Sequence, residues 1–106
     1  GDFKDGMAVV CNENGQHTHI DKEGKFIHSC WFCQLDVFHK GFARAKDKQG
    51  WGHINRQGKF IYQNRYETVE PFYNGIAHVE DFKGRLFLIN ETGEIVKTLY
   101  DISGLL

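Results

Sequence analysis

The chain has little of what marks a nucleic-acid-binding or membrane protein. Its 106 residues hold 13 Lys and Arg against 14 Asp and Glu, so no basic excess provides a footprint for nucleic acid. Lys and Arg never cluster beyond a residue or two, which argues against an acidic membrane surface. The longest apolar run falls far short of the roughly 18 residues that a membrane span needs. We expect neither kind of partner.

Cysteine and proline are scarce as well. Three Cys without framework spacing fit a reducing compartment better than a secreted one, so we expect a cytoplasmic location. No signal peptide is recognisable and the first residue is Gly, so we interpret the chain as a fragment of a longer protein, or as one trimmed of a tag. One Pro among 12 Gly indicates many tight turns in a well-ordered chain.

What the chain does have is an internal repeat, which must be recognised before any other pattern. The motif Phe-x-x-Gly-apolar-Ala-x-(Val/Ala) occupies residues 3–10, 38–45 and 72–79. A second motif, in which Asp or Asn precedes Gly by three residues between apolar flanks, occupies residues 20–27, 54–61 and 89–96. Asp or Asn can open a turn and Gly can close it, so the second motif predicts a hairpin turn.

The spacing of the glycines defines the units. The first motif's Gly recurs at 6, 41 and 75, and the turn Gly at 24, 58 and 93. The steps are 35 then 34 for the first and 34 then 35 for the second, so the middle unit is one residue short in the loop around 47–49. Residues 1–106 therefore form one domain of three units, 3–37, 38–71 and 72–106.

Each unit predicts three or four short strands. The first carries the Ala motif, and its alternation places Ala8 and Val10, like their equivalents, on one buried face. The second runs into the turn, near 16–20, 50–54 and 85–89, and the third leaves it, near 25–28, 59–62 and 94–98. A spacing of three between Phe32, Leu35 and Phe38 predicts a short strand with a bulge, or one helical turn, before each motif Phe.

We therefore predict an all-β fold of three tandem antiparallel meanders. Closure around a pseudo-threefold axis, propeller-like or trefoil-like, would hide the open strand edges of an array of three. The alternative is one continuous twisted antiparallel sheet. A unit of about 34 residues cannot bury a core alone, so stability must come from the joins between units.

The middle unit resembles the WG repeat, also called the KWG repeat. Trp51-Gly52 precedes Ile54, Asn55 and the turn Gly58, as in that family, and Phe38-x-x-Gly41-x-Ala43 comes before them. The resemblance extends over all three units, although the Trp-Gly place holds His17-Thr18 in the first and Leu86-Phe87 in the third. It implies a β-rich binding or scaffolding repeat, often bacterial and attached to other domains, with no shared catalytic residues and no cofactor.

One group of side chains has the elements of a metal site. Cys30 and Cys33 form a lone CxxC, and His17 and His19 lie a short hairpin away. Two Cys and two His can hold tetrahedral zinc, but no second CxxC is present, and residues three apart on a straight strand face opposite sides. The main interpretation is buried or half-buried free thiols, with zinc as the alternative.

The six His residues do not form a catalytic pattern. His19 and His53 are equivalent in the repeat, and the third unit has Leu88 there. A position that accepts His or Leu indicates packing rather than a general base. We find no Ser-His-Asp order, no paired-carboxylate cleft and no Gly-rich phosphate loop, so we do not expect an enzyme.

Aromatic side chains are the better candidates for binding. Trp and Tyr anchor many interfaces, and their flat rings also stack on sugars. The candidates are Trp31, Trp51, Tyr62, Tyr66 and Tyr73. The competing interpretation is that Trp51 and Tyr66 fill the joins between units.

Three functions follow, in order of preference. The first is a non-catalytic binding or scaffolding module of a larger bacterial protein, with a protein, or other domains of the same polypeptide, as partner. The second is a module that binds a carbohydrate or small ligand through Trp and Tyr. The third is a domain that binds metal through Cys and His.

Overall fold

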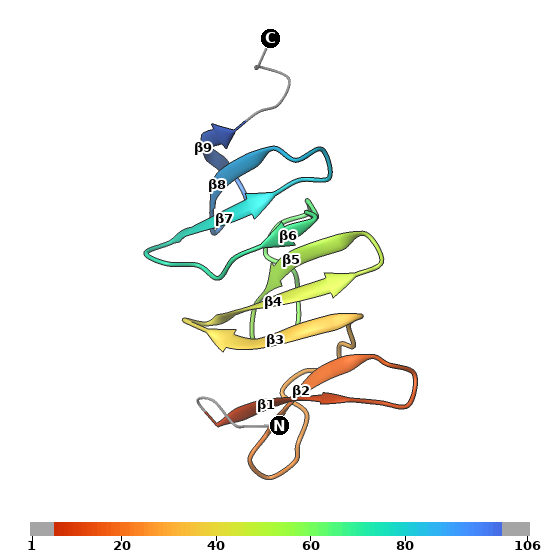
Figure 1. Ribbon diagram of the computed structural model, residues 1–106. Coiled ribbons are helices and arrows are strands. Elements are labelled where there is room, and N and C mark those ends of the chain that lie inside the picture. Colours follow the sequence, from red (N-terminus) through yellow and green to blue (C-terminus); the bar gives the residue numbers. More distant parts are fainter. Residues whose placement is uncertain (1–5, 101–106) are drawn as a thin grey trace.

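The computed structural model describes residues 6–100, which form antiparallel strands joined by turns (Figure 1). The strands are β1 (Met7–Cys11), β2 (His17–Asp21), β3 (Gln34–His39), β4 (Phe42–Asp47), β5 (Gly50–Ile54), β6 (Thr68–Val69), β7 (Ile76–Glu80), β8 (Leu86–Asn90) and β9 (Ile95–Tyr100). No helix long and apolar enough to cross a membrane occurs between residues 6 and 100. The all-β prediction is confirmed.

Three separate antiparallel sheets contain these strands, in the orders β1-β2, β3-β4-β5 and β6-β7-β8-β9. Each sheet is built on the hairpin of the Ala-motif strand and the strand after it. The last strand of one sequence unit then pairs with the first strand of the next, β3 with β4 and β6 with β7. Sheets and sequence units are therefore offset, because each of the first two units gives its last strand to the sheet of the next unit.

The sheets stack along a line, and the first and third lie at opposite ends of a body measuring 54 × 30 × 21 Å (Figure 1). The expected propeller-like or trefoil-like closure is wrong for the described residues. The alternative of one continuous sheet is also wrong, since three sheets form. The reason is the forward transfer of a strand, which extends the array in one direction without bringing its first and last units together.

The predicted hairpin turns are present. The Asp21 carboxylate accepts hydrogen bonds from the backbone N–H groups of Glu23 and Lys25, both at 2.9 Å. Gly24 closes this turn with φ of 81°, in the left-handed region that Gly enters without steric cost. Asn55 and Asn90 open the equivalent turns with the same pair of backbone bonds.

The missing residue of the middle unit lies where the spacing places it. Asp47 pairs directly with Gly50 across a two-residue turn. In the first unit the backbone N–H of Asn12 reaches the carbonyl of Gln16, one residue further on. The third unit has the longer turn as well, between Asp81 and Arg85.

The third strand expected in every unit forms only in the last, as β9. In the first unit the chain makes a single bridge between Ile20 and Phe26, leaves the sheet, and returns with a second bridge between Phe32 and His17. The second unit repeats this path at Phe60 and Tyr66. The expectation is wrong for these two units because histidine-centred hydrogen bonds, described below, hold the chain away from the sheet.

The short strand with a bulge, expected before the motif Phe, is confirmed in β3. Its register with β4 shifts between Leu35 and Phe38, which accommodates the spacing of three residues. Pro71 lies just after β6, where no ladder hydrogen bond is required of it.

Two hydrophobic cores lie between consecutive sheets. The first contains Met7, Phe32, Phe38, Ala43, Ala45 and Ile54. The second contains Tyr62, Tyr66, Val69, Phe72, Ala77, Val79, Phe87 and Ile89. Both cores combine side chains from two successive units, so the joins provide the burial that no single unit can provide.

Candidate functional site

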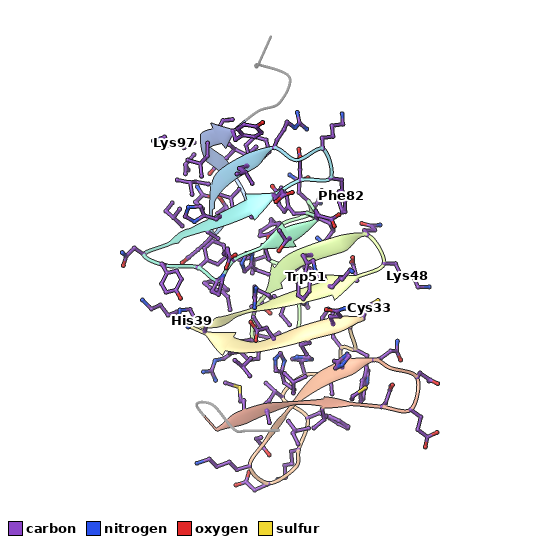
Figure 2. The ribbon with its side chains drawn as sticks, viewed as in Figure 1. Cys33, His39, Lys48, Trp51, Phe82 and Lys97 are labelled. Carbon is purple, nitrogen blue, oxygen red and sulfur yellow. The ribbon has the colours of Figure 1, made fainter. Side chains whose placement is uncertain are left out.

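The structure does not assemble the metal candidate. No group of three or more His, Cys, Asp or Glu side chains within residues 6–100 has the arrangement to hold a metal ion. Cys30 is half-buried, as interpreted, but Cys33 (labelled in Figure 2) is exposed, so that interpretation is wrong for this thiol; both cysteines are free. His19 is fully buried with both ring nitrogens engaged in hydrogen bonds. The set His17, His19, Cys30 and Cys33 is therefore not brought together as a ligand set.

His19 instead anchors the chain that follows it. Its Nε2 lies 2.7 Å from the carbonyl oxygen of Asp36, and its Nδ1 lies 2.9 Å from Nε2 of His28. A carbonyl can only accept, so His19 Nε2 carries the proton and His19 Nδ1 accepts one from His28. His28 Nδ1 is then free to accept from the backbone N–H of Cys30, at 3.2 Å. The chain of bonds is complete only when both imidazoles are neutral.

His53 repeats the arrangement in the second unit. Its Nε2 donates to the carbonyl of Glu70 at 2.8 Å, and its Nδ1 accepts from the Tyr62 hydroxyl at 2.6 Å. Each anchor histidine also packs against the motif Phe of the next unit. The ring centroids lie 4.3 Å apart for His19 and Phe38 and 4.2 Å apart for His53 and Phe72.

Burial lowers the pKa of both anchor histidines to about 4, because the charged imidazolium would lose its hydration. The backbone carbonyls of Asp36 and Glu70 raise the pKa but do not compensate. A general base near neutral pH would instead need an open cleft and a pKa near 7. The predicted packing role of this position is therefore extended by a hydrogen-bonding role.

The third unit has no such anchor. Leu88 replaces the histidine, and Lys97 stands where the other units have His28 and Tyr62. Without a buried hydrogen bond to hold it off, the segment pairs with β8 along its length and becomes β9. All six residues of β9 are exposed.

Two of the five aromatic candidates are part of the core. Tyr62 is 8% exposed and Tyr66 is 4% exposed, so neither ring faces solvent. Trp51 is half-buried and packs against the second core, which agrees with the competing interpretation that it fills a join. Burial removes the rings of Tyr62 and Tyr66 from contact with a partner.

The two other candidates are exposed. Trp31 is 37% exposed and lies edge-on to Phe26, which is 62% exposed, with 5.8 Å between ring centroids. Tyr73 is 57% exposed beside His39, at 5.0 Å between ring centroids, and beneath the Lys40 ammonium at 5.7 Å. Binding through Trp31 and Tyr73 stays a prediction.

Sequence reasoning did not select Phe26, although comparison of the repeats identifies it. The second unit has Phe60 at this place and Arg65 in place of Trp31. The Arg65 guanidinium lies 3.4 Å from the centre of the Phe60 ring and is held by Asp47 at 3.1 Å. The first unit exchanges this covering Arg for Trp31, so Phe26 remains open to solvent.

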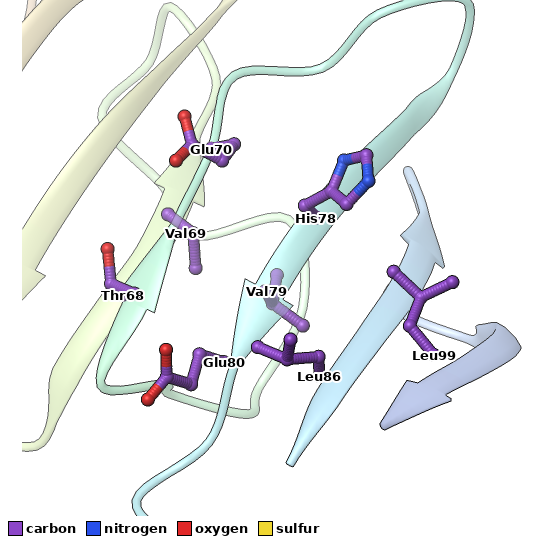
Figure 3. Close-up of a pocket in the computed structure, with 8 residues that line it drawn as sticks. All are labelled: Thr68, Val69, Glu70, His78, Val79, Glu80, Leu86 and Leu99. Carbon is purple, nitrogen blue, oxygen red and sulfur yellow. The ribbon is translucent and has the colours of Figure 1, made fainter. Parts of the chain in front are cut away.

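A pocket of about 120 Å³ opens on the third sheet (Figure 3). Its lining comes from β6 and the residue after it, β7, β8 and β9, and consists of Thr68, Val69, Glu70, His78, Val79, Glu80, Leu86 and Leu99. The lining is mainly apolar, with carboxylates from Glu70 and Glu80. None of these residues was selected from the sequence, because the pocket depends on what unit three lacks rather than on a motif.

Comparison with known proteins supports the resemblance in part. Residues 51–81 match the family described as WG containing repeat. The matched stretch begins at Trp51, the orthodox Trp-Gly pair, and runs through β6 and β7 to the turn after β7. No curated protein matches the chain.

Proposed function

We propose that this chain is a non-catalytic binding or scaffolding module of a larger bacterial, cytoplasmic protein, made of three WG repeats, and that its partner is another protein. The match over residues 51–81 supports a repeat module. Three free cysteines, two of them exposed, support a reducing compartment. The elongated stack presents a large surface for its size, as repeat arrays do when they bind extended partners.

The observation that carries the proposal is the Phe26–Trp31 pair. Two adjacent large aromatic rings, both open to solvent, provide apolar area that a partner can bury at little cost in side-chain entropy. The equivalent pair of the second unit, Phe60 and Arg65, is already satisfied within the chain. Exposure is therefore a property of this pair and not a requirement of the repeat.

The test combines removal of the pair with a reconstituted complex. Proteins recovered with the tagged full-length protein are identified, and the best candidate is purified and titrated against the wild-type chain. The double variant Phe26→Ala/Trp31→Ala should weaken this binding by about thirtyfold, the effect of losing a hot spot worth roughly 2 kcal/mol. Val96→Ala, an exposed apolar residue of β9, is the matched control and should bind as the wild type does.

Two results would contradict the proposal. One is unchanged affinity of the double variant for every partner that can be reconstituted. The other is specific binding on a glycan array that depends on Trp31 or Tyr73, which would support the carbohydrate alternative instead.

A further inference from the structure

The pocket on the third sheet exists because unit three lacks two large side chains that unit two has. In unit two the equivalent place holds Arg44 and Trp51, and in unit three it holds His78 and Leu86. Arg44 lies over the Trp51 ring, with 6.0 Å between the guanidinium carbon and the ring centroid, so two large side chains occupy this place. The smaller His78 and Leu86 leave that space open (Figure 3).

Charge changes at the same place. In unit two the Arg44 guanidinium donates twice to the Asp36 carboxylate, at 2.9 and 2.6 Å, and once to the Val69 carbonyl at 3.2 Å. Glu70 is the equivalent of Asp36, but no salt bridge among residues 6–100 reaches it. The site retains the acceptor and has lost the guanidinium.

A second carboxylate adds to the first. Glu80 stands where unit two has Lys46, so a cation has been exchanged for an anion. Thr68 pairs with Glu80 across β6 and β7, and Glu80 pairs with Leu86 across β7 and β8, so these side chains share one face of the sheet. Glu70 lies two residues after Thr68 and diagonally opposite Glu80, next to the apolar residues that line the pocket. The face is therefore complementary to a cation with an apolar stem.

We propose that this pocket binds an arginine side chain presented by a partner polypeptide. The guanidinium takes the place of that of Arg44, donating to Glu70 and Glu80, and the aliphatic stem lies against Leu86 and Leu99, because Val79 faces the second core. A planar, five-donor guanidinium can address two carboxylates at once, whereas an ammonium is a point charge. The site goes beyond the proposed function, since it lies in the third unit and the Phe26–Trp31 pair lies in the first.

The experiment is a titration of the ¹⁵N-labelled chain followed by NMR. N-acetyl-arginine amide should shift the amide signals of residues 68–70, 78–80, 86 and 99, with a Kd in the low millimolar range expected of a single side chain. N-acetyl-lysine amide should bind at least about threefold more weakly, and N-acetyl-leucine amide should cause no shift. Free arginine, whose own carboxylate is repelled by the two glutamates, should also bind more weakly, which distinguishes a peptide source from the free amino acid.

Variants that copy unit two provide the strongest test, because the fold already accepts these residues at the equivalent places. Glu80→Lys and Leu86→Trp should each abolish the arginine-dependent shifts, the first by charge and the second by filling the pocket. Glu70→Gln should weaken binding by about fivefold. Glu91→Gln, in the exposed turn after β8, is the control and should bind as the wild type does.

The proposal is overturned if N-acetyl-arginine amide causes no shifts at about 50 mM, if the lysine and leucine probes bind equally well, or if the shifts lie elsewhere. A Glu80→Lys variant that keeps a wild-type spectrum and still binds overturns it too. The Phe26→Ala/Trp31→Ala variant should bind the arginine probe normally, so failure of the proposed function leaves this result readable by itself.

Discussion

At the scale of single residues, the two anchor histidines connect what would otherwise be loose loops. His19 and His53 each fix a backbone carbonyl 17 residues further along the chain. Each also receives a hydrogen bond from a buried side chain nine residues on, His28 or Tyr62. Because both ring nitrogens are used in one defined tautomer, neither imidazole can accept a proton without losing a hydrogen bond.

The first prediction is that acid destabilises the domain well before its carboxylates titrate. Each anchor has a folded pKa of about 4 and an unfolded pKa near 6.5, so the unfolded state binds the proton more readily. The stability contributed by the neutral form is complete above pH 6.5 and is lost as the pH falls towards 4. The loss should reach roughly 3 kcal/mol for each histidine.

Urea unfolding at pH 7.5, 5.5 and 4.5 measures this loss directly. The double variant His53→Leu/Tyr62→Phe copies the apolar Leu88 and leaves neither hydrogen-bonding side chain of that anchor in place, so it should have a smaller pH dependence than the wild type. His78→Gln, an exposed histidine, is the control. Equal pH dependence in the wild type and the double variant would show that His53 is not the titrating group.

At the scale of elements, each turn glycine after the first packs against an aromatic ring of the preceding unit. A Cβ built on Gly58 would come within 2.8 Å of the His28 ring, and one built on Gly93 would collide with Tyr62. His28 and Tyr62 are the equivalent partners of the two anchors. Gly24 has no neighbour within 4 Å. The hydrogen-bond partner of each anchor histidine therefore packs against the turn glycine of the next unit, and this contact occurs at both joins between units.

The second prediction compares these glycines. All three have φ near 80°, so Ala costs each of them the strain of the left-handed region, roughly 1 kcal/mol. Gly24→Ala should show that cost alone. Gly58→Ala and Gly93→Ala should lose roughly 3 kcal/mol, because the methyl group also displaces a packed ring. Thermal or urea unfolding measures the difference in stability. Equal losses of stability at Gly24 and Gly93 would contradict a packing role for Gly93.

Elements that depend on local chemistry could be predicted from the sequence, and those that depend on distant contacts could not. The Asp21 and Asn55 turns and the bulge before Phe38 follow from residues close together in the sequence, and the short loop at Asp47 follows from the spacing of the glycines. The path of residues 25–33 does not, because it is set by hydrogen bonds from His19 to His28 and Asp36. From alternation alone, the start of that segment and β9 are both predicted to be the third strand of their unit.

At the scale of the whole molecule, stability comes from two cores that each belong to two units. Ala43 lies in the first core together with Phe32 and Phe38, and it is almost fully buried. The third prediction is that Ala43→Phe overpacks this join and unfolds the chain in one cooperative transition. Circular dichroism and amide exchange should report the same midpoint. Independent melting of one unit would contradict it, and Val96→Phe on exposed β9 is the control.

The sequence pattern predicts the strands and the buried face of each unit, but it does not predict whether the three units close into a ring. The alternation of Ala8, Ala43 and Ala77 predicts a buried face in every unit, and the structure buries all three. Whether three units close or stack depends on which strands β3 and β6 pair with, and no local alternation pattern predicts those pairings. The same limit applies to the pocket. It becomes visible only when His78 and Leu86 are set against Arg44 and Trp51.

The offset between sheets and sequence units decides where such a chain can be lengthened or cut. If one whole repeat is inserted at an interior loop, the last strand of every unit that has a successor still pairs with the first strand of the next unit. The length of the array can therefore change in steps of 34 or 35 residues. Cutting is different. A cut after Asp36 or Val37 divides β3, so Ala45 and Lys46 of β4 lose their partners Leu35 and Gln34, whereas a piece that begins at Cys33 keeps β3 with its sheet. Excision before β3, and not at the motif Phe, should therefore release a soluble piece.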